Sequence, residues 1–204
     1  MDQPQRQEAP HRGRGRPRSA SIDQRVLDAA LDLLVEAGPG AVNIDAVARR
    51  TGASRAAIYR RWRHADELLW SAMDQALMTA AGRTHLGPPY SPDGMEFDAA
   101  VRQLVRRLAE IFSEKRFGAS YLALVTARRQ DSTAQQSLER YTTRMVDGVA
   151  AMLGGSMQGM SSSPRVVADL IVGLVVYKVL IEGVALTPET IDATAGMITA
   201  GAMA

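Results

Sequence analysis

The sequence NIDAVARRTGASRAAIYRRW, at residues 43–62, decides the fold of this chain. Its first half predicts a short helix that begins after Asn43, because the apolar side chains of Ile44 and Val47 share one helical face. The side-chain oxygen of Asn43 can accept a bond from the first turn of that helix. Thr51-Gly52-Ala53 then predicts a tight turn, since glycine often ends a helix.

The second half of this stretch predicts another short helix, over residues 55–61, that is capped by Ser54 and packs inward through Ile58 and Trp62. Two short helices joined by a tight turn that contains glycine form a helix-turn-helix, whose second helix enters the major groove of DNA. In a helix of this length the side chains opposite Ile58 share one face. They are at positions 55, 56, 59 and 60.

The distribution of charge also indicates a polyanionic partner. The formal net charge of the 204 residues is only +2, but the first 70 residues carry +3 and the rest carry −1. The acid-free stretches 11–18 and 49–63 hold ten of the 22 arginines. Arginine offers a planar fork of donors that suits phosphate and guanine edges. A GC-rich genome would also favour arginine, so the placement of the arginines is more informative than their number.

Helical periodicity continues to the end of the chain, and neither a repeat nor a convincing strand is found, so the predicted fold is all-α. Gly38-Pro39-Gly40 ends the first helix, residues 87–94 form a loop, and 154–164 form a mobile connection. The predicted domains are a flexible basic arm at 1–20, a helix-turn-helix domain at 21–65 and a helical domain at 66–204. The predicted helices cover residues 21–37, 44–51, 55–61, 66–81, 97–112, 121–128, 138–153, 165–186 and 189–203.

Five motifs, in their order along the chain, resemble the N-terminal domain of the TetR family of bacterial transcriptional regulators. They are RVLDAA at 25–30, EAG at 36–38, NIDAVA at 43–48, TGAS at 51–54 and IYRRW at 58–62. The resemblance implies an N-terminal three-helix helix-turn-helix domain and a C-terminal helical domain for effector binding and dimerisation. It also implies a dimer that binds a palindromic DNA operator, with repression as the commoner mode of action.

The candidate DNA contacts combine this resemblance with the exposed face of the second helix. Arg55 is the best candidate for a bidentate contact to guanine, and Tyr59 resembles the family's phosphate-contacting tyrosine. The full set is Arg14, Arg16, Asn43, Ser54, Arg55, Ala56, Ala57, Tyr59, Arg60 and Arg61. This chain departs from the family at two places. The family often has Gly-Thr where this chain has Ala56-Ala57. It also commonly has a lysine that contacts phosphate where this chain has Ala65, and Arg63 or His64 could supply that contact instead.

The arm sequence Arg14-Gly15-Arg16-Pro17 looks like the core of an AT-hook. Such an arm lays its arginines in a narrow AT-rich minor groove, where the negative potential is concentrated. A generic basic tail that touches only phosphates is the open alternative.

The C-terminal part is predicted to form a homodimer and to hold a small, mostly apolar effector. Residues 165–186 are apolar on nearly every side, so they and 189–203 are expected to form the dimer interface, the alternative being a helix buried within one monomer. Arg128 is a candidate anchor for an anion. The other candidate pocket residues are Trp70, Met73, Phe112, Phe117, Tyr121, Tyr141, Met145 and Tyr177, for each of which ordinary core packing is the alternative.

The sequence does not favour an enzyme. It has no cysteine, its three histidines have no metal-ligand spacing, and Gly154–Gln158 lacks the final glycine of a nucleophile elbow. We expect no cofactor, no metal and no membrane span, and a cytoplasmic location. The alternative functions are a non-specific DNA-compacting protein, or a helical small-molecule binder or enzyme with a vestigial DNA-binding head.

Overall fold

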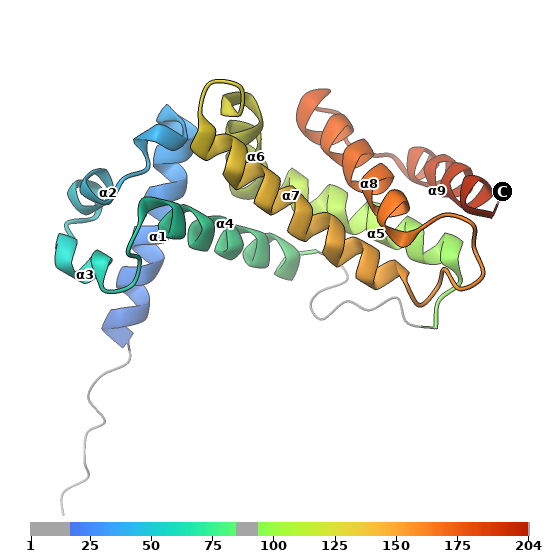
Figure 1. The fold of residues 1–204 in the computed structure, drawn as a ribbon, viewed down its shortest axis with the longest axis horizontal. Coiled ribbons are helices and arrows are strands. Elements are labelled where there is room, and N and C mark those ends of the chain that lie inside the picture. The colour runs from blue at the N-terminus through green and yellow to red at the C-terminus, as the bar shows by residue number, and fades with distance from the viewer. Residues whose placement is uncertain (1–16, 85–93, 204) are drawn as a thin grey trace, which may run out of the picture.

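The computed structural model describes residues 17–84 and 94–203, with side chains described from Ile22 onward, and every regular element in these ranges is a helix (Figure 1). The all-α prediction is confirmed. The α-helices are α1 (Pro17–Ala37), α2 (Ile44–Thr51), α3 (Arg55–Tyr59), α4 (Ala65–Gly82), α5 (Phe97–Ser113), α6 (Lys115–Ala127), α7 (Ser132–Leu153), α8 (Pro164–Val175) and α9 (Pro188–Met203). A 3-10 turn, η1 (Pro39–Ala41), follows α1, and a π-helical segment, η2 (Val176–Ile181), follows α8.

The helix-turn-helix forms where it was predicted, because each helix end is satisfied locally. The side chain of Asn43 accepts a hydrogen bond from the backbone N–H of Ala46 at 2.8 Å. Gly52 ends α2 with φ 70°, a left-handed conformation that favours glycine, and its N–H donates to the carbonyl of Ala48 at 2.9 Å. Ser54 caps α3 by accepting from the N–H of Ala57 at 3.2 Å.

The head consists of α1, α2 and α3 packed on the start of α4, and it lies at one end of the molecule (Figure 1). Its buried side chains come from all four helices and from the segment between α3 and α4. They include Val26, Ala30, Leu34, Val47, Ile58, Trp62 and Leu68. Because α4 continues from this core into the body, the predicted boundary at residues 65/66 falls at the start of a helix that both parts share.

The body is built around α5, which packs against α4, α6, α7, α8 and α9. Val101, Leu104 and Val105 of α5 have no exposed surface. The chain turns sharply from α5 into α6, where a Cβ atom at Gly118 would lie only 2.2 Å from the carbonyl oxygen of Phe112. Glycine is therefore needed for this close approach. The helices α8 and α9 lie at the end opposite the head (Figure 1).

Several predicted helix bounds are wrong. α1 begins at Pro17 rather than at residue 21, since proline suits the first position of a helix. α6 and α7 begin at 115 and 132, before the predicted 121 and 138. Their first turns are held by Glu114 and Asp131, whose carboxylates accept from Phe117 N–H at 2.9 Å and Ala134 N–H at 3.0 Å. These acidic caps precede the apolar periodicity and were missed.

The single buried helix predicted at 165–186 is also wrong. The α-helix ends at Val175, the π-helical segment η2 follows, and Gly183 takes a positive φ of 70°. Val167 and Ile171 are buried, whereas Val166 and Leu170 on the other face of α8 are exposed. The hydrophobic residues are therefore divided between the core and the surface, which a count of apolar residues cannot reveal.

Among the described residues, each helix is either too short or too polar to span a lipid bilayer. The same part of the chain brings together no group of three or more His, Cys, Asp or Glu side chains that could hold a metal ion.

Candidate DNA-binding surface and ligand site

The two faces of α3 differ as the sequence predicts. Ile58 is 1% exposed and anchors the helix in the head core, while Tyr59 is 50% exposed. Arg55, Ala56 and Arg60 are also exposed. α3 thus presents a surface of arginine, small and aromatic side chains that a DNA groove could accept.

Arg61 and Trp62 follow α3 and fix it to the neighbouring helices. The helix itself ends at Tyr59, earlier than the predicted residue 61. The Nε1–H of Trp62 donates to Ser71 Oγ of α4 at 2.9 Å. Arg61 is ion-paired with Asp23 of α1 and donates to the carbonyl of Ala57 at 3.2 Å. Of the predicted contacts, Arg61 is therefore directed towards α1 rather than along the exposed face of α3.

Two other arginines of the acid-free stretch 49–63 have acidic partners from outside it. Both oxygens of Glu36 accept from Arg50 at 2.7 Å, and Arg55 Nε lies 2.7 Å from an oxygen of Asp45. Arg60 has no acidic partner within 4.0 Å among the described residues. Surface ion pairs contribute only about 0–1 kcal/mol, so these arginines can still bind DNA.

A hollow of about 320 Å³ lies beside this surface, where the N-termini of α2 and α4 meet. Asn43, Tyr59, Arg63 and His64 line it. Backbone N–H groups at a helix N-terminus, a phenol and a guanidinium are all groups that bind phosphate. Arg63 and His64 therefore stand next to Ala65, at which the resemblance implies a lysine. The predicted arm contacts, Arg14 and Arg16, lie outside the described residues.

Six of the predicted ligand-binding residues meet in the core of the body. The ring centroids of Phe112 and Tyr121 are 5.1 Å apart, those of Phe112 and Phe117 5.4 Å, and those of Phe117 and Tyr141 6.3 Å. Met73 and Met145 are buried in the same core. We call Phe112, Phe117, Tyr121 and Tyr141 the aromatic cluster.

The two tyrosines of the aromatic cluster place their hydroxyls on polar partners. Tyr121 shares a hydrogen bond of 2.9 Å with Thr142, and Tyr141 donates to Asp74 at 3.0 Å. Burial raises the pKa of both phenols, and the nearby carboxylate of Asp74 raises that of Tyr141 further. Both phenols are therefore neutral donors or acceptors at physiological pH.

The other three predicted pocket residues are not brought into the aromatic cluster. Trp70 is half-buried, and its Nε1–H donates to Ser137 Oγ at 3.3 Å. The guanidinium carbon of Arg140 lies 3.8 Å from the centroid of the Trp70 ring. Arg128 is exposed at the end of α6 and donates to the carbonyl of Val125. Tyr177 is exposed in η2, beside Lys178.

Ser120 was missed by the sequence analysis. It lies in α6 next to Tyr121 and is fully buried, and its Oγ has no hydrogen-bond partner within the described part of the chain. A buried hydroxyl without a partner costs about 1–3 kcal/mol. Serine carries no sequence signal for burial, so only the packing of α6 reveals this group.

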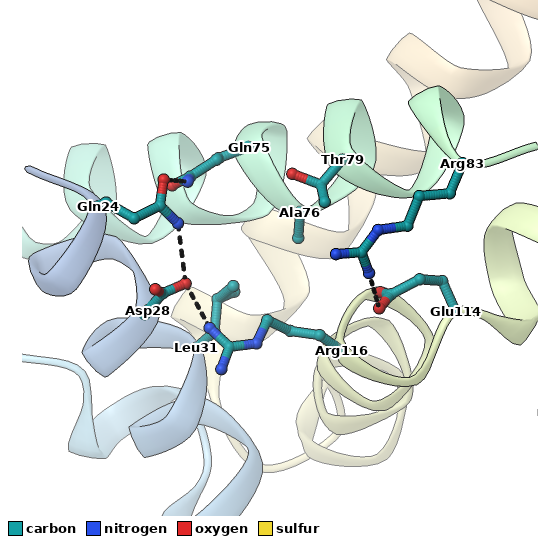
Figure 2. A pocket seen from close by; sticks show the side chains of 9 residues that line it. All are labelled: Gln24, Asp28, Leu31, Gln75, Ala76, Thr79, Arg83, Glu114 and Arg116. Carbon is teal, nitrogen blue, oxygen red and sulfur yellow. Dashed lines mark hydrogen bonds and ion pairs between the residues drawn. The ribbon is translucent and has the colours of Figure 1, made fainter. Parts of the chain in front are cut away.

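A polar hollow between head and body was also missed, because its residues come from three distant helices. Figure 2 shows Gln24 and Asp28 of α1, Arg83 at the end of α4, and Arg116 of α6 around it. Arg116 is ion-paired with Asp28, and its other Nη atom lies 3.4 Å from Asp32. Arg83 pairs with Glu114 at 3.2 Å. The hollow has a volume of about 320 Å³.

Fold and site together define a class of protein: a helix-turn-helix DNA-binding regulator with a separate helical body. The model of the family "Bacterial regulatory proteins, tetR family" matches residues 26–71. The uncharacterized HTH-type transcriptional regulator YdeS of Bacillus subtilis (strain 168) is 30% identical over 180 residues, which are 83% of this chain and 84% of YdeS.

Solved structures share the same fold. Salmonella enterica GusR matches with a TM-score of 0.64 and 13% identity, over 93% of this chain and 97% of that one. A transcriptional regulator from Rhodococcus sp. Rha1 matches with a TM-score of 0.55 and 17% identity, over 89% of this chain and 98% of that one. The chain belongs to the TetR family and is a DNA-binding transcriptional regulator.

Proposed function

We propose that this regulator is a repressor that binds a palindromic operator as a homodimer and leaves it when a small, mostly apolar effector binds. The observation that carries the proposal is the exposed face of α3, which is anchored by Ile58 and Trp62 on a buried core. Such a face can be inserted into a groove without unfolding the head. Repression itself is taken from the family's commoner mode.

On this proposal, Arg55 reads a guanine in the major groove, and Ala56 and Ala57 allow α3 to approach closely. Arg60 contacts a phosphate or a base edge. Asn43, Ser54 and Tyr59, with Arg63 in the hollow beside them, hold phosphates and set the register of the head on the duplex. Arg61 acts indirectly, because its pairing with Asp23 keeps α3 on α1.

The dimer is proposed to form through α8 and α9. Leu170 is 56% exposed and Met197 is 70% exposed, and they line an apolar hollow of about 360 Å³ between the two helices. A Cβ atom at Gly173 or Gly196 would meet nothing within 4 Å, so a second copy could approach closely there. A two-fold dimer would place two heads on half-sites about 34–36 Å apart.

The effector is proposed to bind beside the aromatic cluster. The aromatic rings favour an apolar ligand, and the unpaired hydroxyl of Ser120 offers one polar contact. We infer that the effector binds more tightly to a state in which the spacing of the two heads does not match the two half-sites. Effector binding then lowers the DNA affinity by the ratio of the effector affinities for the two states. The ion pair between Arg116 of α6 and Asp28 of α1, which joins body and head in Figure 2, is a contact that such a change would shift.

Selection of DNA from a random library by the full chain tests this proposal. We expect a palindromic motif for the wild type, and for Arg55→Ala a relaxed preference at one position per half-site with a loss of roughly 1–3 kcal/mol. Tyr59→Phe is the matched control, because losing a phosphate contact should weaken all sequences alike.

The outcomes separate the candidate functions. Enrichment of no motif at all would support the non-specific DNA-compacting alternative. A motif that Arg55→Ala leaves unchanged would show that Arg55 does not read bases. Turnover of a small molecule by a chain that binds no DNA would support an enzyme with a vestigial head.

A further inference from the structure

The base-reading arginine of the proposed function is held by an acid from the other helix of the motif. Asp45 lies in the first turn of α2, and its Oδ1 atom is 2.7 Å from Nε of Arg55, the first residue of α3. The two side chains are 49% and 64% exposed. The pair is therefore at the surface, and Arg55 is on the face of α3 that the proposed function places against DNA.

A carboxylate at this place opposes DNA binding unless it has a specific role. Asp45 also lines the hollow of Asn43, Tyr59 and Arg63, which suits a phosphate. Its negative charge repels that phosphate and cancels one cationic contact. A favourable interaction of the carboxylate with the α2 dipole would explain its presence without any effect on base preference.

The atom that Asp45 contacts indicates a more specific role. The closest approach of the carboxylate is to Nε, whereas the two Nη groups of a guanidinium form the end-on fork that matches O6 and N7 of guanine. A guanidinium already ion-paired within the protein also loses less rotamer freedom when it binds DNA. Among the described residues, the ion pairs of the stretch 49–63 involve Arg50, Arg55 and Arg61 but not Arg60, so the guanidinium of Arg60 lacks this constraint.

We propose that Asp45 is a positioning residue that fixes Arg55 for reading guanine and keeps it from the neighbouring phosphates. This proposal rests on the assignment of Arg55 as a base reader. On this proposal, Asp45 lowers the total affinity for DNA and raises the preference for the selected sequence. Its loss should therefore have opposite effects on specific and non-specific binding.

Two substitutions of Asp45 separate the effect of a polar oxygen beside Arg55 from the effect of the negative charge. Asp45→Asn and Asp45→Ala remove the same charge, but only asparagine keeps an oxygen that can accept from Arg55. We expect the ratio of affinities for the selected motif and for a scrambled duplex to fall by roughly 3–10-fold in Asp45→Ala and by less in Asp45→Asn. Affinity for the scrambled duplex should rise by the same amount in both.

Two controls complete the experiment. In the Arg55→Ala background, Asp45→Ala should leave the base preference unchanged, because the residue it positions is gone. Asp66→Ala removes another first-turn acid, from α4, for which the structure shows no ion pair among its described residues. It should lower the unfolding midpoint without changing the selected motif.

Each outcome tells the two proposals apart. If Arg55→Ala leaves the selected motif unchanged, the assignment of Arg55 fails and the role of Asp45 fails with it. If Arg55→Ala relaxes the motif but Asp45→Ala does not, only the positioning role is overturned. Equal loss for selected and scrambled DNA in Asp45→Ala would also overturn it, since that result reflects stability of the head.

Discussion

At the scale of single residues, Tyr141 combines burial with a hydrogen bond to Asp74, so Tyr141→Phe tests what the bond contributes. We expect a loss of about 0.5–1.5 kcal/mol of unfolding free energy at pH 7. The pKa of Tyr141 is raised in the folded state, so above about pH 10 its phenol ionises in the unfolded state but stays neutral in the folded state. This ionisation stabilises the unfolded state and so lowers the unfolding free energy of the wild type. The difference between the two proteins should therefore shrink as the pH rises past 10, as measured by urea unfolding.

Tyr59→Phe is the control for this measurement, because it removes an exposed hydroxyl from α3. It should leave the unfolding free energy at pH 7 within about 0.5 kcal/mol of wild type. A gap between wild type and Tyr141→Phe that stays constant from pH 7 to 11 would contradict the folded-state shift.

At the scale of helices, the exposed apolar face of α8 and α9 is the feature that the folded monomer leaves uncovered. Leu170→Glu should convert the proposed dimer into a folded monomer. The dimer should be lost because its interface would bury a charge. The monomer should still fold because the side chain of Leu170 is 56% exposed in the single chain. Sedimentation velocity measures the change of mass, and circular dichroism checks that the helices remain.

Met78→Glu is the matched control for this element. Met78 is 64% exposed on α4 and does not line the hollow between α8 and α9. It should leave the oligomeric state unchanged. A Leu170→Glu protein that still sediments as a dimer would place the interface elsewhere.

At the scale of the whole molecule, the charge asymmetry predicts how the N-terminal arm contributes to DNA binding. Removal of residues 1–16 leaves α1 intact, since that helix begins at Pro17. It removes four arginines and two acidic residues. The slope of log K against log salt concentration should fall by about 0.9 for each phosphate contact that is lost.

Fluorescence anisotropy titrations of the selected DNA at several salt concentrations measure this slope. An unchanged slope would remove the arm from the binding site. A truncated protein that also loses preference for AT-rich sequence beside the motif would favour the minor-groove arrangement of Arg14 and Arg16 over phosphate contacts alone.

The helix-turn-helix was predictable because its determinants are local. Asn43, Gly52 and Ser54 each satisfy backbone groups only a few residues away, so they act whatever the rest of the chain does. The orientation of α3 followed from the spacing of Ile58 and Trp62. The start of α6 did not, because Glu114 caps it before any apolar periodicity begins.

The partners of the arginines were not predictable, because they come from elsewhere in the chain. The stretch 49–63 contains no acid, yet Arg50, Arg55 and Arg61 are paired with Glu36, Asp45 and Asp23. Packing of α1 and α2 against α3 brings these acids within reach. Counting the arginines of this acid-free stretch alone therefore overestimates the positive charge that the head presents to DNA.

The sequence by itself determined the all-α fold, the place of the DNA-reading helix and the family, because caps, turns and periodicity act over a few residues. Tertiary structure decided which apolar side chains are core and which are surface. It packed the rings of the aromatic cluster together, left the Val166 and Leu170 face of α8 uncovered, and assembled the polar hollow from α1, α4 and α6. These features depend on contacts between residues distant in the chain, which only the packing of helices brings together.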